Sequence, residues 1–405
     1  MKFKIIPSGQ AYVLAFITVS LFLAATNIQG GWLYIIDSLL LSLLFFSLIT
    51  PINQIRRLKF SRTFSKAVYE DEKMEVEVEI DNPGKRIVSF IEVLDIAPRR
   101  KTESAVITDD EKSSRFFIEI GSGEKAVFKY KLIPEIRGVY SFDKFVISSY
   151  GPFGLFKFSR SLAAKDELLV YPNLPILSSL FLSGLTGAGY KYSSKTRHNA
   201  DASLPYNIRE YRRGDNKKLI HWRSTARMNK LMVKELENEQ SLSIQILFDT
   251  EKGSYIGRGK ESNFEYMLKF AGAIFKFCSD KDYKVEFIYY ENDTVHKLTE
   301  VTSWKQVLDT FAYLDTYSKK KVRELLKEKE IDFNSILIPF FLKPDAKDIE
   351  SLEQLYRDNF SVIPVFAEIN SFDSFYYPVK DTVSKCSYKS IMIKQGEDFR
   401  NHVLV

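Results

Sequence analysis

The sequence contains few of the residues that build metal sites or disulfides. Its only cysteines are Cys278 and Cys386, and its four histidines are scattered. Neither a metal-ligand spacing nor a disulfide framework is present, so a reducing compartment is the simplest interpretation. Gly184, Gly187 and Gly189 lack the following Lys-Ser/Thr of a P-loop and the strand–turn–helix context of a dinucleotide site. Histidine-rich metal sites and P-loop nucleotide sites are therefore disfavoured.

A strong overall charge is also missing, and the charge that is present lies in one segment. The formal net charge is +6 over 405 residues. Between Tyr190 and Lys234 there are twelve Lys/Arg and three Asp/Glu, which leaves the rest of the chain at about −3. An interaction with an acidic partner would have to depend on this segment.

Two long apolar runs open the chain. Residues 11–28 carry no charge, and residues 32–52 carry only Asp37. About 20 apolar residues in a helix cross the ~30 Å hydrocarbon core, so the sequence predicts a transmembrane hairpin over residues 1–59. Lys and Arg flank both ends but not the Gly-Gly connector, which places the N-terminus and main body in the cytoplasm. A cleaved signal peptide is the alternative. The flanking basic residues are Lys2, Lys4, Arg56, Arg57, Lys59, Arg62 and Lys66.

Residues 60–165 alternate between apolar and polar positions. Met74, Val76 and Val78 point one way in an extended chain while the intervening glutamates point the other, and an Asn-Pro-Gly turn follows. Several such runs with turns between them predict a β-sandwich. A domain of this kind is more often a spacer or binding module than a catalyst.

The chain then changes character twice. Residues 166–241 begin rich in Pro, Gly and Ser, which predicts a linker that leads into a basic motif. From residue 242 to 405, apolar strands alternate with amphipathic helices, which predicts a doubly wound α/β sheet with parallel strands. Ligands in such sheets bind at the carboxyl ends of strands, and Asp249 ends the first one.

The basic motif reads "REYRRGDNKKLIHWRSTARMNKLMVKELENE" over residues 209–239, followed by a buried strand that ends in Asp. With the upstream "PEIRGVYSF" and "YGPFGLF", it resembles the family called domain of unknown function 58. The resemblance implies two N-terminal membrane spans, a β-sandwich and a von Willebrand factor A-like domain. It also implies a MoxR-type AAA+ ATPase as partner, and no enzymatic activity is established for the family.

Two interpretations of the motif stay open. In one, Asp215 accepts hydrogen bonds from Arg209 or Arg227 and Trp222 packs between domains. In the other, the surplus cations form a docking surface for an acidic partner. Five acidic residues cannot neutralise nine basic ones between Arg209 and Gln240, so some cations must face solvent or a partner. The candidate binding residues are Arg209, Tyr211, Arg212, Arg213, Gly214, Asp215, His221, Trp222, Arg223, Arg227, Lys234 and Glu235.

A metal site at Asp249 is the other candidate. A von Willebrand A-type site needs Asp-x-Ser-x-Ser, whose carboxylate and hydroxyls suit Mg²⁺. Here Glu251 and Gly253 stand at the hydroxyl positions, and Lys252 adds a positive charge. The motif is degenerate, so the sequence favours no cofactor, with Mg²⁺ at Asp249 as the open alternative.

The sequence therefore favours a non-enzymatic, membrane-anchored cytoplasmic scaffold that binds a protein partner and the lipid bilayer. Two alternatives remain. One is a metal-dependent hydrolase that uses Asp249, Asp215 and His221, which must then share a pocket. The other is nucleotide or nucleic-acid binding through the basic motif, which the membrane anchor and the modest charge disfavour.

Overall fold

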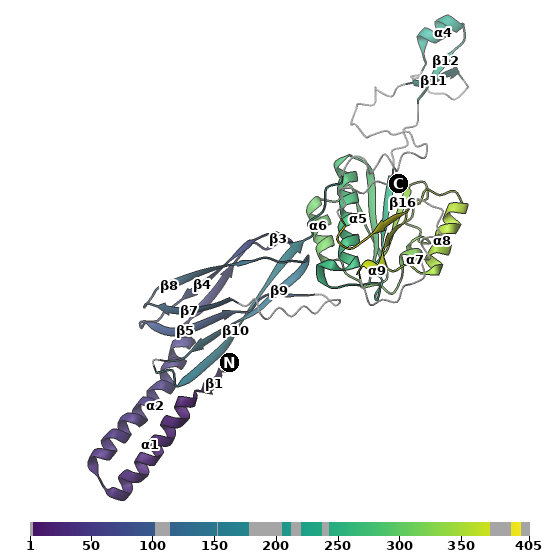
Figure 1. Cartoon of the computed structure of the whole chain (residues 1–405). Coiled ribbons are helices and arrows are strands. Elements are labelled where there is room, and N and C mark those ends of the chain that lie inside the picture. The colour runs from purple at the N-terminus through teal and green to yellow at the C-terminus, as the bar shows by residue number, and fades with distance from the viewer. Residues whose placement is uncertain are drawn as a thin grey trace. The chain divides into compact units, whose positions relative to one another are not determined.

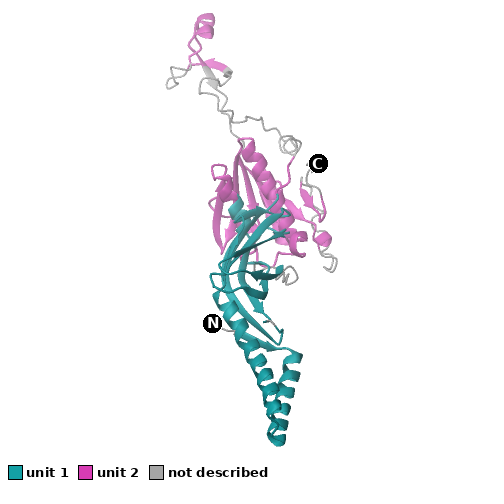
Figure 2. Ribbon diagram, turned by 90° about the vertical axis from the view of Figure 1, so that its left-hand side faces the viewer, with its two compact units in different colours: residues 1–173, 308–315 teal, residues 174–307, 316–405 magenta. Residues whose placement is uncertain are grey.

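A computed structural model describes residues 3–101, 114–151, 153–177, 205–211, 220–236, 243–372 and 390–397. The chain divides into two compact units (Figure 2). Unit 1 comprises residues 1–173 and 308–315, and unit 2 comprises residues 174–307 and 316–405.

Unit 1 begins with two long apolar helices (Figure 1). Helix α1 spans Gly9–Ile28 and α2 spans Gly31–Arg57. The Ser8 side chain caps α1 by accepting a hydrogen bond from the Ala11 amide, and Gln29 ends it in a left-handed conformation. Both helices are long and apolar enough to cross a membrane. The predicted helical pair is confirmed, and its membrane location is consistent with this length and composition.

The strands of unit 1 form two sheets around one core. The larger has seven strands, with the path β1-β10-β9-β5-β7 and short strands β3 and β6 beside it, and the smaller has the order β2-β4-β8. The predicted alternation in β4 is confirmed, because Met74, Val76, Val78 and Ile80 are buried. Buried residues of both sheets belong to the same cluster. The bounds are β1 Phe3–Pro7, β2 Lys59–Thr63, β3 Ala67–Tyr69, β4 Met74–Asp81, β5 Val88–Asp95, β6 Arg99–Arg100, β7 Ser114–Ile120, β8 Lys125–Leu132, β9 Gly138–Ser149 and β10 Phe156–Tyr171.

Strand β1 was not expected from the sequence. It pairs antiparallel with β10, from Phe3 opposite Arg160 to Pro7 opposite Phe156. Five residues directly before an apolar helix carry no hairpin signal, and only the distant partner β10 makes them a strand. Both ends of the helical pair therefore continue into strands of the same unit. Strand β10 itself runs to Tyr171, into the stretch predicted to be linker.

The environment of Arg62 differs from the one that its sequence position predicts. Its place among the basic residues after the second apolar run predicts an exposed side chain, but the side chain is fully buried. The guanidinium pairs with Asp95 through both Nε and Nη2, and Nη1 donates to Asp166 Oδ2 at 2.8 Å. It also lies 4.2 Å from the ring centre of Phe142 and 4.4 Å from that of Phe145. Arg62 therefore belongs to the sandwich interior and not to the flank of the helix.

Unit 2 contains a six-stranded sheet with the order β15-β14-β13-β16-β17-β18. All neighbouring strands are parallel except β14 and β15. Buried strands alternate with helices along the chain, as predicted. The strand bounds are β13 Ser243–Phe248, β14 Lys284–Glu291, β15 Thr294–Thr299, β16 Ile336–Phe341, β17 Val365–Ala367 and β18 Ile391–Ile393.

Helices cover both faces of this sheet. Phe248 of β13 meets Phe264 of α5 edge-on, at 5.6 Å between ring centres. On the other face, Leu247 belongs to a buried cluster with residues of α7 and α8 (Figure 1). Two elements are short: α7 is one turn, and β17 begins only after Pro364. The helix bounds are η3 Gly259–Glu261, α5 Asn263–Asp280, α6 Trp304–Tyr313, α7 Val322–Leu325, α8 Ala346–Arg357 and α9 Ile369–Phe372.

Candidate functional site

The basic motif folds into a small module, named here the β11–α4–β12 module. Strand β11, Pro205–Glu210, pairs antiparallel with β12, Met232–Leu236, and α4, Trp222–Met228, lies between them in the chain. The sequence predicted a linker and a turn here and gave no sign of paired strands. An isolated bridge between Ile220 and Val233 extends the pairing.

Local hydrogen bonds hold α4 in place. The His221 Nδ1 atom accepts the Ser224 amide at 3.3 Å and lies 2.7 Å from Ser224 Oγ, as an N-terminal cap does. The Thr225 hydroxyl accepts the Met232 amide at 3.0 Å, and Asn229 ends the helix in a left-handed conformation. His221 is thus engaged in capping, and its described hydrogen bonds stay within the module.

Helix α4 buries none of its residues. Trp222 is 68% exposed, Met228 63% and the nearby Leu231 47%. A seven-residue helix has little intrinsic stability in water, and large apolar side chains at a surface commonly mark an interaction site. The docking interpretation of the motif requires an exposed Trp222, and the module presents one.

Cations accompany these apolar side chains. Arg223 and Arg227, one helical turn apart, are exposed, and neither pairs with a carboxylate among the residues that the structure describes. Lys230 does pair, at 2.6 Å from Glu210 Oε1. The module therefore presents an apolar and cationic surface, named here the α4 surface, which consists of Trp222, Arg223, Arg227, Met228 and Leu231.

The other predicted motif residues have different positions. Arg209 lies in β11, where Nη1 donates to the Glu210 carbonyl, and the Tyr211 amide donates to the Leu231 carbonyl at 2.8 Å. Lys234 and Glu235 lie in β12, opposite Ile208 and Asn207. Arg212, Arg213, Gly214 and Asp215 lie outside the described residues.

A second candidate site lies where the order of the six-stranded sheet reverses, at the carboxyl end of β13. Asp249 follows β13 and is 3% exposed, and its Oδ1 accepts the Glu251 amide at 3.1 Å. The segment at Ser318 runs alongside, because the Lys252 amide donates to the Ser318 carbonyl at 2.7 Å. This pairing brings Lys321 and the start of α7 next to Asp249.

Cationic side chains occupy the space between the carboxylates at this switch point. Lys321 Nζ lies 2.9 Å from Asp345 Oδ2 and 3.6 Å from Glu251 Oε2. Arg323 Nη1 lies 2.8 Å from Asp345 Oδ2 and 3.1 Å from Asp348 Oδ1. Asp345 and Asp348 also form the capping box of α8. Two cations thus pair with three carboxylates beside the buried Asp249.

These contacts shift the protonation of the acidic groups in opposite directions. Burial raises the pKa of the Asp249 carboxyl to about 7, because it outweighs the hydrogen bond from the Glu251 amide and the attraction of Lys321, which both favour the charged form. Burial also opposes ionisation of Asp345, but hydrogen bonds from Lys321 and Arg323 outweigh it and hold the pKa of Asp345 well below its usual range. Burial raises the pKa of Asp348.

The residues at the switch point do not fit a Mg²⁺ site. Gly253 offers no ligand, and the Ser254 hydroxyl donates to the Glu251 carbonyl at 2.8 Å. The Lys321 ammonium lies among the carboxylates where a cation would bind. In the part of the chain that the structure describes, no three His, Cys, Asp or Glu side chains converge as metal ligands. The sequence alternative of Mg²⁺ at Asp249 therefore has no support from the geometry.

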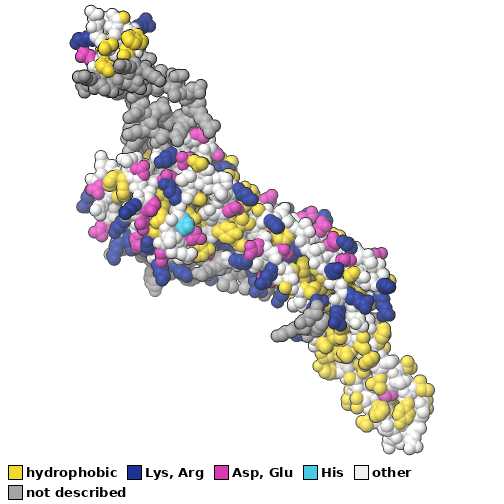
Figure 3. All heavy atoms as spheres, turned by 180° about the vertical axis from the view of Figure 1, so that it is seen from behind, with side chains coloured by type: hydrophobic (Ala, Val, Ile, Leu, Met, Phe, Trp, Pro, Cys, Tyr) yellow, Lys and Arg dark blue, Asp and Glu magenta, His cyan; other side chains and the backbone are white. Residues whose placement is uncertain are grey.

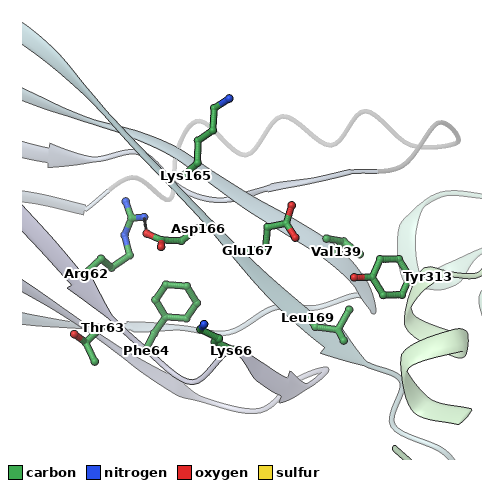
Figure 4. A pocket seen from close by; sticks show the side chains of 10 residues that line it. All are labelled: Arg62, Thr63, Phe64, Lys66, Val139, Lys165, Asp166, Glu167, Leu169 and Tyr313. Carbon is green, nitrogen blue, oxygen red and sulfur yellow. Dashed lines mark hydrogen bonds and ion pairs between the residues drawn. The ribbon is translucent and has the colours of Figure 1, made fainter. Parts of the chain in front are cut away.

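Unit 1 contains a cavity of about 530 Å³ (Figure 4). Arg62 and Asp166 face each other there, and Arg62 also pairs with Asp95, so its charge is neutralised. Glu167 pairs with Lys101. Three of the five charged side chains that line this cavity, those of Arg62, Asp166 and Glu167, are thus paired, and the α4 surface remains the stronger candidate.

The family comparison bears directly on the module. The family model described as "Protein of unknown function DUF58" matches residues 207–321, which include α4, β12 and strand β13 with the following Asp249. Residues 207–321 therefore form a DUF58 region of the chain. A search of curated proteins found no match for the chain.

Three of the solved structures that match the chain have low sequence identity and low TM-scores. The CARDB domain of PF1109 from Pyrococcus furiosus is 15% identical, with a TM-score of 0.18, over 28% of this chain and 94% of that one. A β-glucosidase from Listeria innocua is 15% identical, with a TM-score of 0.19, over 28% and 16%. The C-terminal domain of wzt is 13% identical, with a TM-score of 0.22, over 29% and 75%.

Sequence reasoning missed four residues of the switch point: Lys321, Arg323, Asp345 and Asp348. The last two had a signal, because Asp345 and Asp348 precede and open a predicted helix with capping-box spacing. Lys321 and Arg323 had none, since ordinary basic residues at a helix start gain their role only from distant carboxylates. A shared catalytic pocket would require His221 to lie next to Asp249. No contact between these two residues is present among the described residues.

Proposed function

We propose that this protein is a membrane-anchored docking scaffold that binds a partner protein through the α4 surface. The observation that carries the proposal is the exposure of Trp222, at 68%, beside two arginines without a carboxylate partner in the described chain. Interfaces favour Trp, Met and Arg at their centres, because these side chains combine a large contact area with directional polar groups.

The partner proposed is a protein with an acidic, apolar groove. Arg223 and Arg227 would meet its carboxylates, and Trp222 would enter an apolar pocket. The family resemblance implies a MoxR-type AAA+ ATPase as the candidate, which would supply ATP hydrolysis that this chain has no motif to perform. Strand order and the single antiparallel edge strand also support a von Willebrand factor A-like fold for the α/β domain.

The two apolar helices would hold the scaffold in the membrane, with the main body in the cytoplasm. Lys4, Arg56 and Arg57 lie at the ends of the hairpin and its connector has no Lys or Arg, which supports this orientation. Pairing of β1 with β10 places both ends of the hairpin on the same side. The orientation of the hairpin can be measured in proteoliposomes and intact cells. The measurement is the accessibility, from each side of the membrane, of a thiol introduced by Tyr12→Cys near the start of α1 or by Ile28→Cys at its end.

The partner experiment uses full-length protein in nanodiscs and a purified MoxR-type AAA+ ATPase from the same cell. Binding is measured by biolayer interferometry for the wild type, for Trp222→Ala and for Arg223→Glu/Arg227→Glu. Truncation of a central Trp or reversal of two interface charges costs about 2 kcal/mol or more, so we expect at least about thirtyfold weaker binding.

The matched control is Lys305→Glu/Lys327→Glu, which makes the same charge change at two exposed lysines of unit 2. We expect it to bind as the wild type does. Equal loss in both pairs, or full binding by Trp222→Ala, would show that the α4 surface is not the docking site. Salt-dependent binding to an oligonucleotide that is lost with Arg223 and Arg227 would instead favour nucleic-acid recognition.

A further inference from the structure

The end of unit 1 that carries the two apolar helices has a second unusual surface. Three large apolar side chains are exposed near these helices: Ile87 is 58% exposed, Phe90 59% and Phe153 48%. Ile87 directly precedes β5, Phe90 is the third residue of β5, and Phe153 lies in the turn between β9 and β10. The Tyr150 amide donates to the Phe90 carbonyl at 3.3 Å, so the start of β5 and this turn are neighbours. We name these three residues the apolar tip.

The turn between β9 and β10 is held against the helices. The Ser8 amide, at the start of α1, donates to the Leu155 carbonyl at 2.8 Å. Ser149 Oγ donates to Gln54 Oε1 of α2 at 3.0 Å. Gly151 lies so close to α2 that a Cβ there would be 3.0 Å from Pro51 Cγ. The turn therefore lies at the level of Pro51 on α2.

Helix length then places this level at the edge of the hydrocarbon. Helix α1 has 20 residues, which at 1.5 Å per residue is about 30 Å, the thickness of the hydrocarbon core. From Gly31, α2 reaches the same length at about Pro51. Phe156, at the start of β10, lines an apolar cavity together with Ala15 and Leu48 of the two helices. The strands of unit 1 thus begin at the membrane boundary and not at a distance from it.

Cations lie just above that level. Arg56 and Arg57 form the last turn of α2, about 8–9 Å beyond Pro51 by helix rise, at the outer edge of the headgroup layer, from which their long side chains can reach back to the phosphates. Lys85 and Arg86 lie in the turn between β4 and β5, next to Gly84, whose added Cβ would be 3.5 Å from Arg57 Cδ. All four side chains are exposed, and none pairs with a carboxylate in the described part of the chain. We name them the basic rim.

Nearby acidic groups do not neutralise the basic rim. Glu124 is the acidic side chain of the adjacent turn, and its Oε2 accepts the Gly121 amide at 3.1 Å. In Figure 3, Lys and Arg side chains gather where the apolar helices meet the strands. Each cation near an anionic membrane surface contributes about 1 kcal/mol of attraction.

We propose that this end of unit 1 is a lipid-binding surface, in which the apolar tip enters the hydrocarbon boundary and the basic rim binds the phosphates of anionic phospholipids. Hydrogen bonds with Ser8 and Gln54 hold the turn that carries Phe153 against the two helices. The sandwich therefore rests on the bilayer and is not carried on a free tether. This inference rests on the membrane anchoring proposed above.

The first experiment tests the depth of the apolar tip. The full chain with Phe153→Trp is reconstituted in vesicles of 70% brominated phosphatidylcholine and 30% phosphatidylglycerol. Quenching of the added tryptophan is obtained by difference from the wild type. The control is Tyr69→Trp, because Tyr69 pairs opposite Tyr171 at the far end of β10 from Phe156, about 50 Å along the strand. We expect quenching at position 153 and none at position 69.

Native Trp32, in the first turn of α2, separates the two ways in which this experiment can fail. Its contribution is isolated with Trp32→Phe. If Trp32 is not quenched, the helices are outside the bilayer, and both the anchoring and the lipid-binding surface are refuted. If Trp32 is quenched but the tryptophan at position 153 is not, the anchor stands and only the lipid-binding surface is refuted.

The second experiment tests the basic rim. The full chain is purified from micelles that contain equal phosphatidylcholine and phosphatidylglycerol, and the retained lipids are quantified by mass spectrometry. We expect phosphatidylglycerol to be enriched about tenfold, a difference of ~1.4 kcal/mol. The variant Arg56→Gln/Arg57→Gln/Lys85→Gln/Arg86→Gln should lose this enrichment.

The matched control changes four exposed lysines of unit 2 to glutamine, with the same loss of charge, and should keep the enrichment. An unchanged lipid ratio in the rim variant, or an equal loss in the control, overturns the assignment of the phosphate site. The control positions are Lys305, Lys327, Lys329 and Lys347.

Discussion

Arginines in the two units have opposite environments. The comparison distinguishes a charge that is paired inside the fold from a charge that is exposed and able to bind a partner. Arg62 of unit 1 is fully buried and pairs with Asp95 and Asp166. Arg223 and Arg227 of unit 2 are exposed on a helix that buries nothing. A buried cation is tolerated only when its charge is paired, so the donors of Arg62 are used by Asp95 and Asp166 and are not available to a partner protein. The guanidinium groups of Arg223 and Arg227 remain available.

The switch point of unit 2 falls between these extremes. Lys321 and Arg323 are partly exposed, at 18% and 21% of their side chains, and they pair with the carboxylates around Asp249. Neutralisation by lysine and arginine makes a bound metal unnecessary for holding these carboxylates together. Of these five basic residues, Arg223 and Arg227 are the two without a carboxylate partner in the part of the chain that the structure describes.

The largest expected effect comes from breaking the buried pair. We expect Arg62→Met to destabilise unit 1 by about 3–5 kcal/mol, because Asp95 is left buried and, among the residues that the structure describes, keeps only the Tyr130 hydroxyl, at 2.7 Å, as partner. Denaturant unfolding of the full chain in detergent measures this. A loss below about 1 kcal/mol would mean that Asp95 is reached by solvent.

The next effect depends on pH. Asp249 has a folded pKa of about 7, against about 4 in an unfolded chain, so the folded state holds more protons between these values. Its contribution to stability is present below pH 4 and is lost as the pH rises towards 7 and above. We expect the free energy of unfolding of Asp249→Asn to exceed that of the wild type by about 1–3 kcal/mol between pH 5 and pH 8.

Thermal unfolding of both proteins across this pH range measures that difference. The isosteric asparagine keeps an acceptor for the Glu251 amide, so its own pH dependence comes from other groups. A parallel pH dependence in the two proteins would mean that Asp249 is already ionised well below pH 7.

A smaller effect is expected at the α4 surface. Trp222→Ala should change folding stability by at most about 0.5 kcal/mol, because the side chain is 68% exposed. The same variant should lose partner binding, so stability and affinity separate at this position. A large destabilisation would show that Trp222 packs against another part of the chain, as the alternative interpretation of the motif requires.

The smallest expected effect is that of Mg²⁺. Adding Mg²⁺ or chelating it with EDTA should leave the unfolding temperature unchanged, since Lys321 lies where a cation would bind. Differential scanning fluorimetry in detergent tests this, with Asp249→Asn as control. Stabilisation by Mg²⁺ that disappears in Asp249→Asn would contradict the assignment.

The sequence determined the features that depend on local pattern. Apolar run length predicted both helices of the hairpin, and period-two alternation predicted β4 with the correct buried face. Alternating strands and helices predicted the parallel sheet of unit 2. Asp249 was placed at the end of β13 because a buried run ends there. These features follow from the burial of apolar side chains away from water, and the pattern of apolar residues can be read along a single segment of the sequence.

Only the tertiary structure decided which charges are used internally and which remain available. Arg62 and Arg57 are five residues apart, yet one is buried against Asp95 and the other is exposed. The pairing of β1 with β10 and the approach of Lys321 to Asp345 likewise join segments that are distant in the chain. A charged side chain is neutralised by an opposite charge that the fold brings within a few ångströms of it. The distance between two such side chains cannot be read from a pattern along the sequence.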